Sequence, residues 1–248
     1  MSNAWLPTSP VITDARTRLF CLPYAGGGAA IYRAWIHAIP RSVQVCALQL
    51  PGRENRLIEP AFTSMDALIP ALVEAIRAHL DRPFAIFGHS MGALVAFELT
   101  RALRRKQLPQ PRHLFLSAHR APDLPDRRPP IHQLDDEAFW AEMQRLEGTP
   151  QEVLDNEELK ALVLPTLRAD FQLCETWAAA DEDPLDMPFS IFGGTEDPNV
   201  NQDELEPWRD YTSGAMTLRM LPGHHLFLQQ AQSTVLNAVL EDLRKSGL

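Results

Sequence analysis

The sequence predicts an α/β fold with a mostly parallel central sheet flanked by helices. Short apolar runs alternate along the chain with segments of helical periodicity, which is typical of parallel sheets covered by helices. The chain has 248 residues, a length that α/β folds commonly form as one unit. One of the apolar runs leads directly into the pattern G-x-S-x-G and then into a helical pattern.

Six strands and four helices are expected outside one long insertion. The expected strands are residues 18–22, 43–48, 83–87, 112–117, 187–192 and 216–221. The expected helices are residues 64–80, 91–106, 203–211 and 228–245. In the last of these, apolar residues recur at the three- and four-residue spacing of a helix face.

The insertion lies between the fourth and fifth expected strands, where roughly 65 residues show no strand pattern, too many for a connecting loop. Residues 122–130 are rich in proline and charge and are interpreted as a linker. Residues 149–152 predict a helix start with a capping box. A longer helical pattern begins at Asn156 and is expected to kink or restart at Pro165. We therefore expect a helical lid at about residues 123–185, above the strand ends.

The composition limits the classes of protein to consider. Hydrophobic residues make up 45% of the chain and charged residues 22%, as in ordinary globular proteins. No apolar run approaches the roughly 18 residues of a membrane helix, and the first residues do not resemble a secretory signal. The net charge of −9 argues against a nucleic-acid surface. We expect a single cytoplasmic domain over residues 1–248, a monomer with no membrane or nucleic-acid partner.

The G-x-S-x-G pattern is Gly88-His89-Ser90-Met91-Gly92. An apolar strand precedes it and a helix follows, so the serine would stand on a sharp strand-to-helix turn with its Oγ exposed. The start of the helix also favours negative charge that develops there. Ser90 is therefore the predicted nucleophile of a serine hydrolase with the α/β-hydrolase fold.

A serine hydroxyl needs a base to take its proton, and in this fold the acid and then the histidine follow the serine. His224 and His225 are the histidines of the last third of the chain, directly after the sixth expected strand. His89, beside the predicted nucleophile, is interpreted as a packing residue rather than the base. The base is therefore His224 or His225.

The acid would orient the imidazole and stabilise its charged form. Asp197 follows the fifth expected strand, in a loop where this fold normally presents the acid. Glu196 is its immediate neighbour, and Asp123 is an alternative because it follows the fourth expected strand. Asp197 is favoured over both.

The oxyanion of the reaction needs two backbone N–H donors. One normally comes from the residue after the nucleophile, here Met91. The other comes from a loop near the start of the chain, and the glycine run around Ala25 lets the backbone approach the site closely. We predict the N–H of Ala25 as this donor. No dinucleotide or phosphate-loop pattern and no metal-ligand spacing of cysteines is present, so we expect neither cofactor nor metal.

Four stretches resemble the stand-alone type II thioesterases that accompany nonribosomal peptide and polyketide synthases. They are LPYAGG at 22–27, QLPGRENR at 49–56, GHSMGA at 88–93, and the pair GTPQEVL at 148–154 and LPTLRADF at 164–171. The last pair is specific for this family, because other hydrolases share the G-x-S-x-G turn but not this insertion. The resemblance extends from about residue 18 to the C-terminus. The family's closing motif G-G-H-F-F-L corresponds to residues 223–228, which identifies His225 as the base and places His224 where the family has glycine.

The resemblance implies hydrolysis of acyl thioesters on the phosphopantetheine arm of acyl or peptidyl carrier domains. Such enzymes remove aberrant or stalled acyl groups through an acyl-enzyme, here on Ser90. A general small-molecule esterase or lipase of the same fold remains an alternative, because a Ser-His-Asp triad cleaves either kind of ester. A chain-releasing thioesterase remains another.

Two groups of basic residues are candidate docking surfaces for the partner carrier domain. They are Arg101, Arg104, Arg105 and Lys106 at the end of the helix after Ser90, and Arg127 and Arg128 before the expected lid. The first group has a simpler interpretation, because basic residues near a helix C-terminus stabilise its dipole. In the lid, Phe139, Trp140, Met143 and Leu146 have helical spacing and are interpreted mainly as packing residues.

Overall fold

The computed structural model describes residues 4–7, 12–125, 128–146 and 149–248. Within these residues, six parallel strands form one sheet in the order β2-β1-β3-β4-β5-β6. The strands are β1 (Thr17–Leu22), β2 (Val43–Ala47), β3 (Phe84–His89), β4 (Leu114–Ser117), β5 (Phe189–Gly194) and β6 (Met216–Leu221). Each expected strand is present within one or two residues of its predicted limits, so the predicted α/β fold is confirmed.

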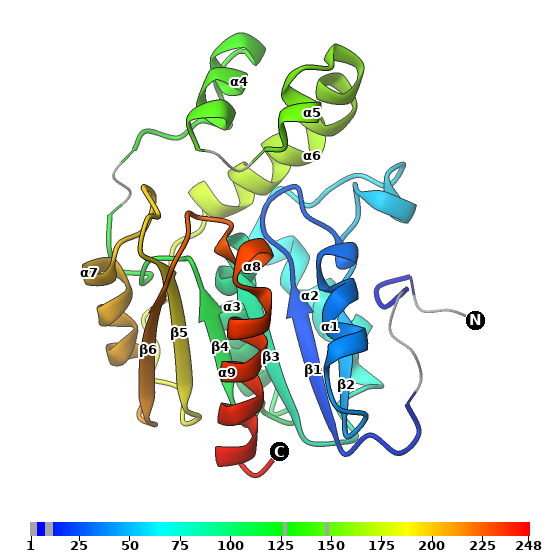
Figure 1. Ribbon diagram of the computed structural model, residues 1–248, viewed down its shortest axis with the longest axis vertical. Helices are drawn as coiled ribbons and strands as arrows, with labels where there is room; N and C mark the ends of the chain where they lie inside the picture. The colour runs from blue at the N-terminus through cyan, green and yellow to red at the C-terminus, as the bar shows by residue number, and fades with distance from the viewer. Residues whose placement is uncertain (1–3, 8–11, 126–127, 147–148) are drawn as a thin grey trace.

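Helices cover both faces of this sheet. They are η1 (Ala29–Tyr32), α1 (Arg33–Ala38), η2 (Glu54–Arg56), α2 (Met65–Arg77), α3 (Met91–Arg105), α4 (Asp136–Arg145), α5 (Gln151–Leu154), α6 (Glu157–Glu175), α7 (Gln202–Leu205), η3 (Glu206–Tyr211), α8 (Phe227–Gln230) and α9 (Gln232–Lys245). Figure 1 shows α1 and α9 on one face, α2 and α3 on the other, and α4 to α6 as a group beyond the carboxyl ends of the strands.

The strand side chains alternate between two apolar cores. In β1, Phe20 and Leu22 belong to the core beneath α2 and α3, whereas Leu19 and Cys21 belong to the core beneath α1 and α9. All of them are fully buried. Because successive side chains of a strand point to opposite faces, a strand buried on both faces is continuously apolar, which is why these runs were recognisable in the sequence.

The helices between β4 and β5 differ from expectation at two points. The predicted capping box at residues 149–152 is wrong: α5 begins at Gln151, and its N-cap is Pro150, which has no side-chain acceptor for the first N–H groups. The predicted restart at Pro165 is also wrong, since α6 continues through Pro165 as one helix with Asn156 as its N-cap. The turns after the proline contact the body of the protein, since Thr166 donates to the Gly52 carbonyl oxygen and Asp170 accepts from the Gly26 N–H.

Two other helices are divided where the sequence predicted single ones. The expected helix 203–211 is α7 followed by η3, and Pro207, which has no N–H, lies at the start of η3. Asn201 and Glu204 form a capping box at the start of α7. The expected helix 228–245 is α8 followed by α9, with Ala231 between them. The short η1 and α1 were not predicted; they bury Tyr32 and Trp35 against the sheet.

No helix in the described part of the chain is both long and apolar enough to cross a membrane. In the same residues, no group of three or more histidine, cysteine, aspartate or glutamate side chains is placed to hold a metal ion.

Candidate active site

Ser90 stands on a strained turn between β3 and α3. Its φ angle is +55°, a left-handed conformation that is costly for a residue other than glycine. A Cβ on Gly88 would lie 1.9 Å from the carbonyl oxygen of Gly92, and a Cβ on Gly92 would lie 2.2 Å from that of Leu22. The two glycines of the pattern are therefore required because backbone passes directly over each of them.

The structure brings Ser90, His225 and Asp197 together from three different loops. Ser90 Oγ lies 2.8 Å from His225 Nε2, and His225 Nδ1 lies 2.8 Å from Asp197 Oδ2. A carboxylate only accepts hydrogen bonds, so Nδ1 carries the proton. In the neutral imidazole Nε2 is then an acceptor, and it faces the hydroxyl of Ser90. This arrangement can remove the proton of Ser90.

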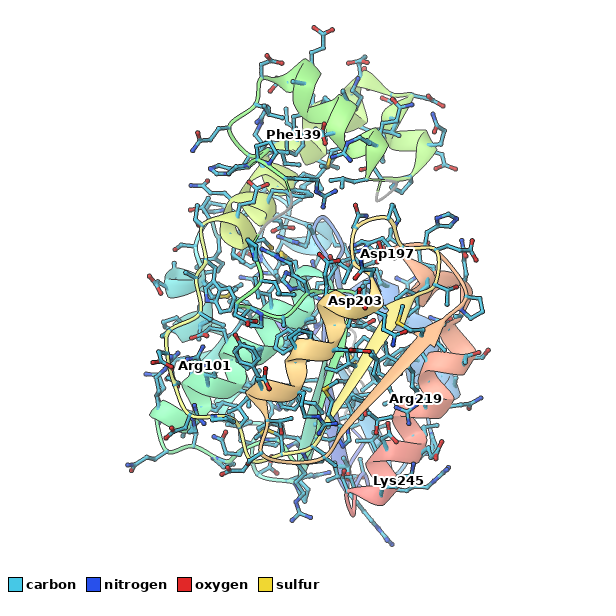
Figure 2. All side chains as sticks on the ribbon, turned by 90° about the vertical axis from the view of Figure 1, so that its left-hand side faces the viewer. Arg101, Phe139, Asp197, Asp203, Arg219 and Lys245 are labelled. Carbon is cyan, nitrogen blue, oxygen red and sulfur yellow. The ribbon has the colours of Figure 1, made fainter. Side chains whose placement is uncertain are left out.

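The carboxylate of Asp197 is fixed at the end of β5. Its side chain is completely buried, and Oδ1 accepts hydrogen bonds from the backbone N–H groups of Asn199 and Val200 at 2.8 and 3.3 Å. Figure 2 shows Asp197 at the end of the sheet that faces the helices carrying Phe139, far from Arg219. The backbone of its own loop therefore orients the acid.

The alternative residues lie elsewhere. The side chain of His224 is half-exposed, and its Nε2 lies 3.5 Å from Glu196 Oε2. Asp123 lies beside Tyr211, where burial and then the negative charge of Asp123 raise the pKa of the Tyr211 hydroxyl to about 12. The structure thus places His225, rather than His224, next to Ser90.

His89 binds the backbone of His225, the histidine beside Ser90. Its Nε2 lies 2.9 Å from the carbonyl oxygen of His225, so Nε2 is the donor, and Nδ1 accepts from the Ser117 hydroxyl at 2.8 Å. Burial, and then the nearby His225, lower the pKa of His89 to about 3. His89 is therefore neutral at ordinary pH and, with both nitrogens engaged, packs beside Ser90 as expected. Its bond to the backbone of His225 was not predicted.

The two predicted oxyanion donors border the same pocket as Ser90. Ala25 and Met91 both line it. Neither of their N–H groups donates a hydrogen bond to any other atom in the described ranges. Backbone N–H groups near a buried site are normally paired, so two unpaired ones beside a serine are available for a ligand oxygen.

Another part of the pocket wall comes from α4, α6 and the loops around them. Met143, Leu146, Leu167 and Phe171 contribute apolar surface there. Phe139 is fully buried and packs edge-on against Trp140 and Phe171. The four apolar residues of the expected lid therefore divide: Phe139 and Trp140 pack within the helices, whereas Met143 and Leu146 also line the pocket.

Three of the four residues of the first basic group form ion pairs within the molecule. Arg101, Arg104 and Arg105 all form ion pairs with Glu182, at 2.9, 3.0 and 2.6 Å. They hold the segment that returns from α6 to β5, which accounts for them without a partner protein. In the second group, Arg128 donates to Asn199 Oδ1 at 2.7 Å, and Arg127 lies outside the described residues.

Two charged residues that the sequence did not single out lie beside the glycine run. Arg53, after β2, and Asp170, in α6, form a buried ion pair that contacts Gly26 and Gly27. Both belong to stretches of the sequence that carried the family resemblance. An arginine and an aspartate in such stretches were the available signal, but no sequence pattern indicated that the two side chains form a pair.

Comparison with known proteins identifies the family of the chain. The profile of the family described as "Thioesterase domain" matches residues 17–246. The chain is 44% identical to linear gramicidin dehydrogenase LgrE of Brevibacillus parabrevis, over 99% of this chain and 94% of LgrE. It is 40% identical to gramicidin S biosynthesis protein GrsT of Aneurinibacillus migulanus, over 98% and 94%. The solved structure of the type II thioesterase BorB from the borrelidin biosynthetic cluster has a TM-score of 0.86 and 33% identity, covering 97% of this chain and 98% of BorB.

Proposed function

Because the chain belongs to the thioesterase family, we propose that it is a type II thioesterase that clears acyl groups from carrier domains. The substrate is an aberrant or stalled acyl thioester on a phosphopantetheine arm. The observation that carries this proposal is the family match over residues 17–246, in a chain whose His225 is hydrogen-bonded to both Ser90 and Asp197. GrsT is named for gramicidin S biosynthesis and BorB comes from a biosynthetic cluster. Acyl or peptidyl carrier domains of such pathways are the proposed partners.

In the proposed acylation step, Ser90 Oγ attacks the thioester carbonyl while His225 Nε2 takes its proton. The negative charge on Asp197 stabilises the imidazolium that forms. The tetrahedral intermediate then collapses with cleavage of the C–S bond, and the proton passes from His225 to the pantetheine sulfur. A thiol, with a pKa of about 8.5, needs little assistance to leave.

In the proposed deacylation step, water replaces the thiol. The water oxygen attacks the acyl carbonyl while His225 takes a proton from the water. His225 then returns that proton to Ser90 Oγ as the bond between Ser90 and the acyl group breaks. The products are a free carboxylic acid and the original enzyme. In both steps the N–H groups of Ala25 and Met91 are proposed to bind the oxyanion, because preorganised donors of this kind lower the barrier strongly.

We further propose that the chain is a single domain and that α4 to α6 form a lid over its active site. Their side chains supply the apolar wall of the pocket opposite Ser90, including Met143 and Phe171. A wall that excludes water strengthens the electrostatic interactions inside the site. The acyl group would lie against it while the pantetheine sulfur faces Ser90.

The dehydrogenase in the name of LgrE does not lead to a second proposal. The glycine run of this chain does not contain the G-x-G-x-x-G fingerprint of dinucleotide-binding folds. The pocket instead holds an arrangement suited to acyl transfer. A general esterase is the remaining alternative, because cleavage of an oxygen ester uses the same steps.

The experiment that tests the proposal compares one acetyl group presented in two ways. It is offered as a thioester on a carrier domain and as a simple oxygen ester, to the wild type and to Ser90→Ala. A strong preference for the carrier thioester, lost in Ser90→Ala, is expected. Equal or faster turnover of the free ester would move the protein to the general esterases. His224→Ala serves as the matched control for His225→Ala, and only the latter is expected to abolish acylation.

A further inference from the structure

The glycine run after β1 has little conformational preference of its own. Gly26 has a φ angle of +76°, and Gly27 and Gly28 follow it. Glycine populates many backbone conformations about equally, so such a run is flexible unless other segments hold it. The N–H of Ala25, a proposed oxyanion donor, belongs to this run. Within the run, the Gly27 N–H donates to the Tyr24 carbonyl oxygen at 2.9 Å. Contacts from other segments add to this turn in setting the direction of the Ala25 N–H.

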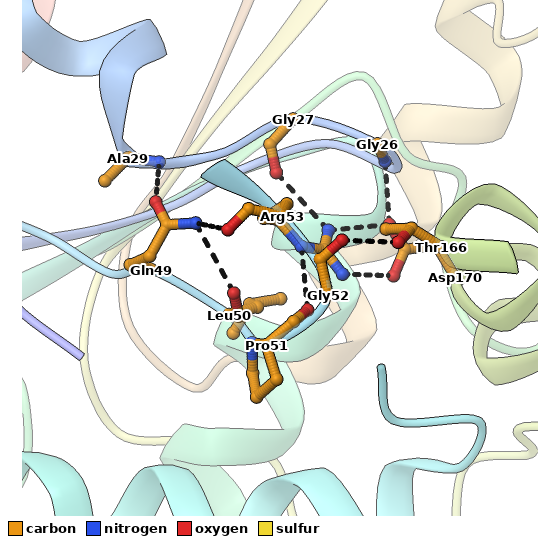
Figure 3. A network of polar contacts seen from close by, with 10 residues as sticks. All are labelled: Gly26, Gly27, Ala29, Gln49, Leu50, Pro51, Gly52, Arg53, Thr166 and Asp170. Atoms are coloured by element: carbon orange, nitrogen blue, oxygen red, sulfur yellow. Dashed lines mark hydrogen bonds and ion pairs between the residues drawn. The ribbon is translucent and has the colours of Figure 1, made fainter. Parts of the chain in front are cut away.

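Arg53 and Asp170 supply those contacts (Figure 3). Asp170 Oδ2 accepts a hydrogen bond from the Gly26 N–H at 2.7 Å, and Arg53 Nη1 donates to the Gly27 carbonyl oxygen at 3.3 Å. Arg53 Nη1 donates to Asp170 Oδ2 at 2.7 Å and Arg53 Nη2 donates to Asp170 Oδ1 at 2.8 Å. The ion pair thus holds the peptide group before Gly26, through its N–H, and the peptide group after Gly27, through its carbonyl oxygen.

The pair joins three segments that are distant in the sequence. Asp170 comes from α6, Arg53 from the loop after β2, and the glycines from the loop after β1. Arg53 Nε also donates to the carbonyl oxygen of Pro51 at 3.1 Å, and the Thr166 hydroxyl of α6 donates to that of Gly52. The α6 helix is therefore bonded both to the glycine run and to the loop that carries Arg53.

Burial makes this arrangement rigid. The side chains of Arg53 and Asp170 are only 5% and 2% exposed. A bidentate arginine–carboxylate pair has one favoured geometry, and its hydrogen bonds are stronger where water does not compete for them. A Cβ on Gly26 would lie 2.7 Å from Cδ2 of Leu167, so α6 packs directly on the run.

We propose that Arg53 and Asp170 are positioning residues for acyl transfer, because their ion pair fixes the Gly26 peptide and so directs the adjacent Ala25 N–H toward the oxyanion. This inference rests on the proposed function only in assuming that Ser90 performs acyl transfer. Buried ion pairs contribute little net stability compared with well-packed apolar side chains. Geometry, rather than stability, is what this pair adds to the molecule.

A second pair in the same chain provides a matched control. Arg219 and Asp242 also bind each other through two nitrogens and two oxygens, at 2.7 and 2.9 Å, and the Asp242 side chain is 4% exposed. Neither residue borders the pocket that contains Ser90. The same substitution in both pairs therefore separates an effect on the site from an effect on folding.

The experiment compares Asp170→Ala and the double variant Arg53→Met/Asp170→Leu with the control Arg219→Met/Asp242→Leu. The double variants replace an ion pair with apolar side chains of similar size, which proteins often tolerate without loss of stability. Thermal unfolding identifies the folded variants. On these, kcat/KM for p-nitrophenyl acetate, its pH profile and the affinity for ethylboronic acid are measured. The boronic acid forms a tetrahedral adduct with Ser90 whose oxygen reports on the oxyanion site.

We expect kcat/KM to fall about 10- to 100-fold in the Arg53 and Asp170 variants, less than the roughly 10²- to 10³-fold cost of deleting an oxyanion donor. The boronic acid should lose affinity by the same factor. The pH profile should keep its position, because His225 and Asp197 retain their hydrogen bonds. In the control, kcat/KM and boronic acid affinity should match the wild type.

Wild-type kcat/KM and boronic acid affinity in folded Arg53 and Asp170 variants would overturn the proposal. A shifted pH profile would also overturn it, since the pair would then act on the histidine. Failure of the proposed function would give a different result from failure of this inference. A wild type that hydrolyses p-nitrophenyl acetate but not the carrier thioester would refute the proposed function, and the variants could still be compared on p-nitrophenyl acetate.

Discussion

Two clusters of serine, histidine and aspartate lie at opposite ends of the same sheet. At the carboxyl ends of the strands, His225 lies between Ser90 and Asp197, with both hydrogen bonds at 2.8 Å. At the amino ends, Ser190 lies between His113 Nε2, at 2.8 Å, and a carboxylate oxygen of Asp242, at 2.7 Å. The residue types are the same, but the order of the hydrogen bonds is different.

That order decides what each cluster can do. The carboxylate of Asp242 only accepts, so the Ser190 hydroxyl donates to it, and His113 Nε2 must then donate to Ser190 Oγ. His113 therefore cannot take a proton from Ser190. Arg219 also binds Asp242, and although burial opposes it, the hydrogen bonds from Arg219 and Ser190 lower the pKa of Asp242. Ser190 is buried, whereas Ser90 borders the pocket. Access and hydrogen-bond order, rather than residue type, distinguish the candidate active site from a structural cluster.

The largest expected difference between the clusters concerns their serines. Ser90→Ala should lower kcat about 10⁶-fold, as removal of the nucleophile does in other serine hydrolases. Ser190→Ala should leave kcat unchanged, because Ser190 is never activated. Steady-state hydrolysis of an acetyl thioester by both purified variants measures this. Loss of activity in a folded Ser190→Ala protein would remove the distinction between the clusters.

The aspartates should differ next. Asp197→Asn should lower kcat up to about 10⁴-fold, since the amide favours the wrong tautomer of His225. Asp242→Asn should keep kcat but lower the free energy of unfolding by about 1–3 kcal/mol, because it weakens the hydrogen bonds of a charged group. Kinetics and urea unfolding of both variants measure these effects. Near-full activity of Asp197→Asn would instead favour Asp123 as the acid.

A smaller effect on kcat is expected for His89, which donates a hydrogen bond to the backbone of His225. His89→Leu removes the donor to the His225 carbonyl oxygen and should lower kcat about tenfold, the equivalent of one hydrogen bond. His89→Gln, which can still donate, should recover part of the loss. His113→Leu is the control and should not change kcat at pH 7. Equal activities of all three variants would show that the backbone of His225 needs no support from His89.

The smallest effect concerns stability and pH. Burial is the main cause that lowers the pKa of His113 from its ordinary value of 6.5 to about 4, with nearby Asp242 opposing it. Between these values the unfolded chain binds a proton that the folded protein does not, so stability falls as the pH falls through this range. In His113→Gln this slope should decrease by up to about 1.4 kcal/mol per pH unit. Urea unfolding between pH 4 and 7 measures it; an unchanged slope would mean that His113 is protonated in the folded protein.

The features that were predictable from the sequence depend on residues close together in the chain. Strand, turn and helix around Ser90 follow one another within a short segment, and the two glycines of the pattern reveal the tight turn. The apolar strand runs were equally visible, because both faces of the sheet are covered. The structure then places Asp197, chosen by its position after the fifth strand, within hydrogen-bonding distance of His225, which the family resemblance selected over His224.

What the sequence did not reveal depends on distant contacts. Arg53 and Asp170 are separated by 117 positions, and no local pattern indicates that an arginine in one loop meets an aspartate in a helix. The bond from His89 to the backbone of His225 is of the same kind, across 136 positions. The divided helices show a local limit as well: Pro207 was visible, but its effect depended on where α7 began.

The ion pair between Arg53 and Asp170 has a consequence for protein engineering. Exchanging the helical segment between two relatives, to transfer acyl preference, looks like a simple graft between β4 and β5. The graft would carry Asp170 with it and leave Arg53 and the glycine run in the recipient. A chimaera should therefore take residues 24–28 and 49–56 from the same donor as the helices. These three segments are separate in the chain but have to be exchanged together.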